Sequence, residues 1–141
     1  MNEINKMSDR DILHSVVESA NDCYNMEEKL NVAKLSLQNI MVKCKDDILS
    51  DCTTIEESLN AVDILRKGFT EQINLIDEIE EKSAFIGYLL NIASPKLKSF
   101  LNKEIGINDS FINSAISDLV ADKQQCGDFI ESVDRLIRIV K

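Results

Sequence analysis

The sequence contains few of the residues that interrupt a helix. It has one proline and four glycines in 141 residues, whereas charged residues make up 29% of the chain. Proline and glycine disfavour helix interiors more than any other residues, so their scarcity allows long helices. The composition therefore predicts an all-α fold, and the length is enough for one domain with its own hydrophobic core.

Residues that usually carry catalysis or bind metals are also scarce. His14 is the only histidine, and a di-metal carboxylate bundle needs two Glu-x-x-His pairs. The four cysteines form no C-x-x-C pair, so neither a zinc site nor a thioredoxin-type redox pair is indicated. We therefore predict that the protein is not an enzyme and has no metal or cofactor. An enzyme or signalling bundle based on His14 or a cysteine is the less favoured alternative.

The sequence lacks a long apolar run and a basic patch. Its most apolar stretch, residues 84–93, has about half of the ~20 residues that a membrane-spanning helix needs. The net charge of −9 repels the phosphates of nucleic acids. Residues 1–7 contain no apolar run, so no secretory leader is predicted. We expect a cytoplasmic protein with reduced cysteines, no membrane insertion and no direct binding to nucleic acid.

Capping residues and apolar periodicity divide the chain into five predicted helices. Thr54 followed by Glu57 has the spacing of a capping box, and Ser94 stands before a proline at a helix start. The polar segment at residues 21–25 weakens the helix there, although the first two helices can also be continuous. Residues 1–7 are predicted to be disordered. The helices are predicted at residues 9–23, 26–50, 54–93 and 96–103, and from Asn108 or Asp109 to the C-terminal end.

Two of these helices have apolar residues in alternating steps of four and three, the spacing of a coiled-coil seam. Arg66, Glu80 and Lys123 fall on seam positions, where charged residues can fix register or the choice of partner. At about 1.5 Å per residue, the helix at 54–93 would be roughly 60 Å long. We therefore predict a single domain over residues 1–141, an elongated antiparallel bundle of four main helices and one short helix with coiled-coil-like packing.

The stretch from residue 84 to residue 101 is apolar on nearly every side. A helix with this property has to be covered all round, either by the first two helices of the same chain or by a second chain. Large exposed apolar patches usually mark interfaces. The predicted partner-binding residues are Phe85, Ile86, Tyr88, Leu89, Ile92, Leu97, Phe100 and Leu101.

An acidic run precedes this stretch, with Asp77, Glu78, Glu80 and Glu81 in five residues. Such a run can dock a basic partner, but a solvated helix face is the favoured interpretation. Among the cysteines, Cys126 falls on a seam position, as does Cys44, and both are expected in the core. Cys23 and Cys52 lie near predicted helix ends and are expected to be exposed.

These features predict a protein that acts by binding another protein through its helical faces. A small acidic chaperone, an adaptor and an inhibitor all fit this description. The alternative is a self-associating structural subunit of a coiled-coil assembly, in which the partner is a second copy of the chain.

Overall fold

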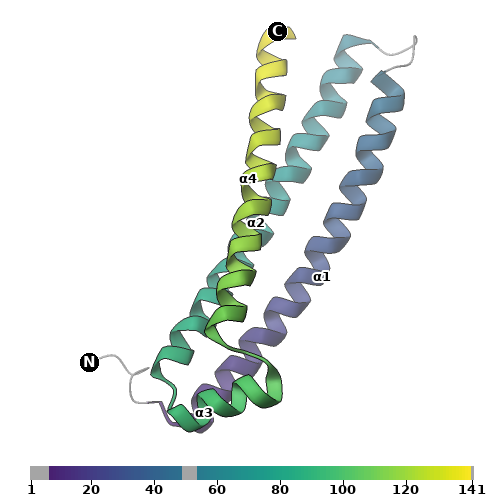
Figure 1. The fold of residues 1–141 in the computed structure, drawn as a ribbon. Helices are drawn as coiled ribbons and strands as arrows, with labels where there is room; N and C mark the ends of the chain where they lie inside the picture. The colour runs from purple at the N-terminus through teal and green to yellow at the C-terminus, as the bar shows by residue number, and fades with distance from the viewer. Residues whose placement is uncertain (1–6, 49–53, 141) are drawn as a thin grey trace. The chain divides into compact units, whose positions relative to one another are not determined.

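The computed structural model describes residues 7–48 and 54–140, which form helices joined by short connections (Figure 1). The predicted all-α bundle is confirmed. The predicted disorder falls largely on residues 1–6, outside the described range. The elements are α1 (Asp9–Ile48), α2 (Ile55–Ile92), α3 (Pro95–Phe100), the π-helical turn η2 (Leu101–Ile105) and α4 (Asp109–Val140).

α1 is one helix across the polar segment at residues 21–25. Cys23 is buried, and it lies seven residues after Val16 and seven residues before Leu30, which are buried as well. Residues seven apart are separated by about two helical turns, so a continuous apolar face runs through the segment. The two helices predicted at residues 9–23 and 26–50 are therefore one continuous helix, which was the alternative prediction. The described residues contain three long helices rather than four.

Side chains cap the helices where the sequence predicts that they begin. At α2, the Glu57 amide donates to Thr54 Oγ1 at 3.1 Å, and the Thr54 amide donates to Glu57 Oε2 at 3.3 Å. Ser94 Oγ accepts an amide of the first turn of α3 at 3.1 Å. At α4, Asn108 Oδ1 accepts an amide at 2.8 Å, so Asn108 is the cap. These bonds satisfy amides that have no partner within the helix.

The segment between α2 and α4 folds back onto the ends of these helices. The short helix predicted at 96–103 is present as α3 and η2. It ends at Gly106, whose φ of 79° lies in the left-handed region that glycine adopts without strain. Because Leu97, Leu101 and Ile107 are buried, this segment adds a layer of apolar side chains to the core.

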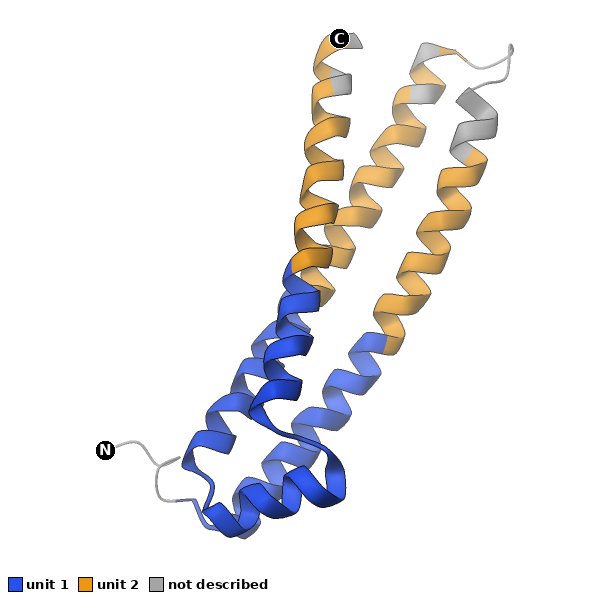
Figure 2. Ribbon diagram, in the orientation of Figure 1, with its two compact units in different colours: residues 1–27, 77–120 blue, residues 28–76, 121–141 orange. Residues whose placement is uncertain are grey.

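The chain forms two compact units, and α1, α2 and α4 each contribute to both (Figure 2). Unit 1 comprises residues 1–27 and 77–120, and unit 2 comprises residues 28–76 and 121–141. The predicted single domain over residues 1–141 stays a prediction.

In unit 1 the start of α1 lies beside the end of α2. The Ser94 hydroxyl, two residues after the end of α2, donates to Asp9 Oδ2 at 2.5 Å. Farther along, Lys82 Nζ lies 3.2 Å from Asp22 Oδ2. The two helices are therefore antiparallel, as predicted. The most deeply buried large side chains of unit 1 are Ile12, Val16, Ile79, Leu89 and Leu101.

In unit 2 the core cluster contains one buried residue from each long helix, namely Leu37, Phe69 and Cys126. Arg66 lies at the margin of this core, where its Nε donates to Asp134 Oδ1 at 2.6 Å and links α2 to α4. The seam position of Arg66 is thus only partly buried, which lets the guanidinium keep contact with water while its stem packs along the helices.

Gly68 marks a close approach of α1 to α2 within unit 2. A Cβ atom at this position would lie 2.7 Å from Leu37 Cδ1, well inside the distance at which two carbon atoms attract each other. The glycine therefore makes room for Leu37.

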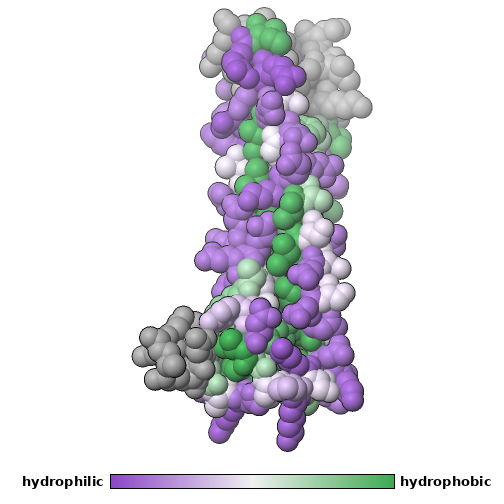
Figure 3. Space-filling model, turned by 60° about the vertical axis from the view of Figure 1, so that its left-hand side comes forward, coloured by the Kyte–Doolittle hydropathy of each residue, from purple (hydrophilic) through white to green (hydrophobic). Residues whose placement is uncertain are grey.

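Hydrophilic side chains dominate the face drawn in Figure 3, and hydrophobic side chains reach that surface in a narrow strip. Scattered exposed apolar side chains are normal on folded domains. A functional surface is therefore better sought where exposed apolar side chains coincide with a groove and with charges of one sign.

Candidate functional site

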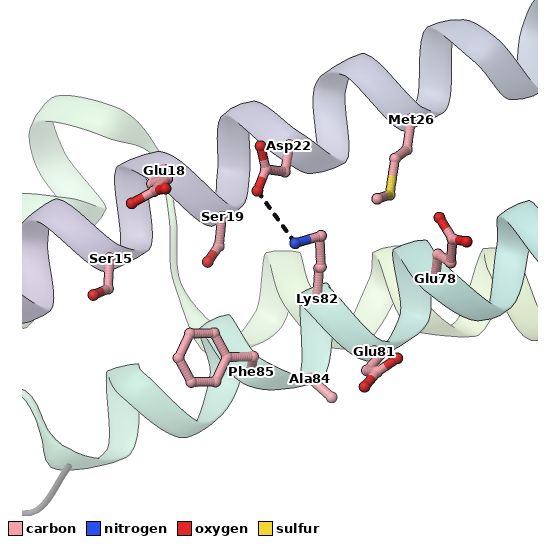
Figure 4. A pocket seen from close by; sticks show the side chains of 10 residues that line it. All are labelled: Ser15, Glu18, Ser19, Asp22, Met26, Glu78, Glu81, Lys82, Ala84 and Phe85. Carbon is pink, nitrogen blue, oxygen red and sulfur yellow. Dashed lines mark hydrogen bonds and ion pairs between the residues drawn. The ribbon is translucent and has the colours of Figure 1, made fainter. Parts of the chain in front are cut away.

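One groove of unit 1 combines these properties. It lies between α1 and α2, has a volume of about 760 Å³, and is drawn in Figure 4. We call it the acidic groove. Its lining residues are Ser15, Glu18, Ser19, Asp22 and Met26 of α1, and Glu78, Glu81, Lys82, Ala84 and Phe85 of α2.

Helical periodicity places the α1 residues on one edge of the groove. Ser15, Ser19, Asp22 and Met26 are spaced by four, three and four residues, so they follow one another along a single side of the helix. In Figure 4 the side chains of Ser15, Ser19 and Met26 extend from α1 toward α2. The neighbouring side of α1 carries the buried core, which holds this edge in place.

The charges in the groove are mainly negative. Lys82 of α2 reaches Asp22 of α1, with Nζ 3.2 Å from Oδ2, and this pair spans the groove. Glu78 and Glu81 are exposed, and neither forms an ion pair with a described residue. Glu18 lies 3.8 Å from His14, which is charged only when protonated. Because Lys82 neutralises Asp22, three carboxylates are left to set the potential of the groove.

Apolar surface lies beside these carboxylates. Phe85 lines the groove and is 38% exposed, and Met26 and Ala84 add further apolar atoms. An exposed phenylalanine ring can pack against an aliphatic side chain, and its face attracts a cation. The groove can therefore accept a ligand that is apolar on one side and positively charged on the other.

The eight predicted partner-binding residues separate into two groups. Phe85, Tyr88 and Phe100 are exposed, and Ile92 is half-buried. Tyr88 lines a second groove of unit 1, on the side of α2 that faces α4. The remaining four are buried in the core of unit 1, where they stabilise the unit and present no surface: Ile86, Leu89, Leu97 and Leu101. These four side chains are therefore covered by the same chain, which was one of the two alternatives for the apolar stretch.

Sequence reasoning identified only part of the acidic groove. Glu78 and Glu81 belong to the acidic run for which the sequence favours a solvated helix face, and the structure places them at the rim of a cleft. Glu18 and Asp22 reach the groove only when α1 pairs with α2, and the sequence does not predict that pairing of faces. The one available clue is their spacing of four residues, which puts two carboxylates on one side of a helix.

The histidine and the cysteines lie apart from any reactive cluster. The side chain of His14 is 83% exposed. Cys23 is buried, which corrects the expected exposure, because α1 continues through it instead of ending there. Burial raises the pKa of the Cys23 thiol, and it also raises the pKa of Cys126. The expected burial of Cys126 is confirmed, whereas the Cys44 side chain and Cys52 lie outside the described residues.

The described part of the chain was also considered for metal binding and membrane insertion by the placement of its acidic, His and Cys side chains and of its apolar stretches. No group of three or more His, Cys, Asp or Glu side chains there is arranged to hold a metal ion. None of the described helices has an apolar stretch of the length needed to cross a membrane.

Comparison with known proteins adds no further assignment. No family model, curated protein or solved structure matches the chain significantly. The fold therefore defines the class, an all-α helical bundle, and the function has to be argued from the groove itself.

Proposed function

We propose that the protein is a non-enzymatic binding module whose acidic groove holds a basic, amphipathic helical segment of another protein. The observation that carries the proposal is the coincidence of three carboxylates with the exposed ring of Phe85 in one groove. A helix docked in a groove is a common mode of peptide recognition, in which apolar residues one turn apart supply the anchors. Lysine or arginine side chains on the flanks of that helix would face Glu18, Glu78 and Glu81.

A small chaperone, an adaptor and an inhibitor all use this kind of contact, and the proposal covers the three. The acidity of the groove favours a protein partner over nucleic acid, since phosphates would be repelled. A cytoplasmic location is part of the same proposal, because cysteines stay reduced in that compartment.

The proposal is tested by isothermal titration calorimetry, in which the full chain is titrated with a synthetic amphipathic helix composed of leucine and lysine. We expect saturable binding that weakens as salt is added, because the rim charges are exposed to solvent. A peptide of the same pattern with glutamate in place of lysine should not bind. Equal binding of both peptides would contradict the proposal.

A matched pair of variants locates the contact. Glu78→Gln with Glu81→Gln removes two negative charges from the groove and should weaken binding roughly tenfold. Glu104→Gln with Asp118→Asn removes two exposed charges of unit 1 that do not line the groove, and it should leave the affinity nearly unchanged. If the two double variants weaken binding equally, attraction is a general effect of net charge and the groove is not the site.

A further inference from the structure

The outer face of α1 within unit 2 carries exposed apolar side chains that the acidic groove does not involve. Val32, Leu35 and Val42 are each more than 60% exposed. Leu30 and Leu37, on the other side of the same helix, are buried. α1 therefore has one apolar face directed into its own unit and a second apolar face directed to solvent.

The exposed face has the spacing and the composition of a coiled-coil seam. Val32, Leu35, Asn39 and Val42 follow one another in steps of three, four and three, which correspond to heptad positions a, d, a and d. A β-branched residue at a and leucine at d favour two strands in parallel dimers. One asparagine at an a position fixes the register, because it pairs with its counterpart on the other helix.

The charges around this face permit two copies to meet there. The chain has 25 acidic residues, yet none falls between Lys29 and Lys45. The flanking e and g positions hold Asn31, Ser36, Gln38 and Lys43, so in a parallel pair Gln38 of one helix faces Lys43 of the other. Two molecules with a net charge of −9 repel each other over most of their surface, whereas this segment has no carboxylate, and of its four lysines only Lys43 stands at one of these flanking positions.

We propose that this face of α1 is the interface of a parallel homodimer, with Leu35 at its centre and Asn39 setting its register. The occupant of the face is a second copy of the chain, paired in register through the same residues. This proposal is independent of the acidic groove.

The mass of the full chain in solution tests the proposal, measured by sedimentation equilibrium over a wide concentration range. Because the seam spans only two heptads, we expect a reversible dimer whose population grows with concentration. Leu35→Glu should abolish the dimer with unchanged helicity by circular dichroism, since the side chain is exposed. Ile64→Glu is the control, because Ile64 is an apolar residue of α2 in unit 2 that is 50% exposed, and this variant should still dimerise.

The direction of the pairing is tested at Gln38. A parallel dimer contains two pairs of residue 38 with Lys43, one on each side of the seam. Gln38→Glu makes both pairs attractive, so the dissociation constant should fall about fivefold, and Gln38→Lys makes both repulsive and should raise it by a similar factor. A chain that stays monomeric at every concentration would overturn the proposal, and so would a dimer that survives Leu35→Glu. The reverse order of the two Gln38 variants would overturn the parallel arrangement.

Discussion

Unit 1 and unit 2 contain parts of the same three long helices, but their cores differ in depth. In unit 1, α3 and η2 bring Leu97 and Leu101 against the helices, and Leu89 is fully inaccessible. The described residues of unit 2 have no such added segment, and their central cluster is flanked by partly buried side chains. The added segment closes the core of unit 1 around Leu89, whereas in unit 2 Ile76 is fully buried but Leu37 and Cys126 border a groove.

The exposed surfaces of the two units differ as well. Unit 1 offers a cleft with carboxylates and an aromatic ring, which suits a partner of opposite charge. Unit 2 offers a helix face with a seam pattern and no carboxylate, which suits a second copy.

The largest expected effect concerns the depth of the two cores. Leu89→Ala in unit 1 should lower the free energy of unfolding by about 2 to 5 kcal/mol, because a closed core cannot collapse around the missing atoms. Leu37→Ala should cost less, since Leu37 borders a groove of unit 2 of about 290 Å³ where neighbours can relax. Denaturant unfolding followed by circular dichroism measures both. A larger loss for Leu37→Ala would reverse the comparison, and Ile64→Ala, at an exposed position of α2 in unit 2, serves as the control.

The next effect concerns how often each core opens. The thiolate is the reactive form of cysteine, and burial raises the pKa of both Cys23 and Cys126 above the ordinary value of 9.0. The two side chains are similarly buried, with 9% of Cys23 and 6% of Cys126 exposed, but Cys126 lines the groove of unit 2. We expect iodoacetamide to modify Cys126 about tenfold faster than Cys23, as judged by mass spectrometry of the peptides. In denaturant the two rates should converge, and faster modification of Cys23 in the folded protein would refute the difference in opening.

A smaller effect separates two glycines of unit 2. Gly127→Ala should raise the free energy of unfolding by about 0.5 to 1 kcal/mol, because alanine favours the helix and its new Cβ would meet no atom within 4 Å beyond its chain neighbours and its own helix backbone. Gly68→Ala gains the same helix propensity, but its new methyl group would press against Leu37. The free energy of unfolding of this variant should therefore be lower than that of Gly127→Ala. Thermal unfolding of the two variants measures the difference, and equal stabilisation would show that Leu37 moves aside without strain.

The smallest effect concerns the ion pair at the margin of unit 2. Arg66 Nε lies 2.6 Å from Asp134 Oδ1, and both side chains are well exposed to water. Pairs of this kind contribute about 0 to 1 kcal/mol, so Arg66→Met should change the free energy of unfolding by no more than that. The same measurement in high salt should abolish any difference from the unmodified protein. A loss of several kcal/mol would show that the guanidinium has a structural role in the core.

Local sequence signals predicted the helix starts, because a cap depends on residues three positions apart. Thr54, Ser94 and Asn108 all cap the helices that follow them. At residues 21–25 two local signals conflict. The polar side chains favour a break in the helix, whereas Cys23 continues the apolar spacing of seven residues. The helix is continuous because the apolar residues spaced by seven, Val16, Cys23 and Leu30, are all buried. Only tertiary packing supplies that burial.

The candidate site was harder to predict than the helices. The stretch from residue 84 to residue 101 contains both core and surface residues, and its composition alone cannot separate Leu89 from Phe85. Likewise, Glu18 and Glu81 meet at one groove although they are 63 positions apart in the sequence. Such pairings depend on which helix faces lie together, and periodicity within one helix does not determine that.

The central claim is that the acidic groove of unit 1 binds a basic amphipathic helix. Its most direct test is a titration of isotope-labelled protein with the leucine and lysine peptide, followed by two-dimensional nuclear magnetic resonance. We expect the amide signals to shift in two segments of unit 1, residues 15–26 and 78–85, and those of the outer face of α1 in unit 2 to be unaffected. Shifts spread over all acidic surfaces, or confined to unit 2, would contradict it.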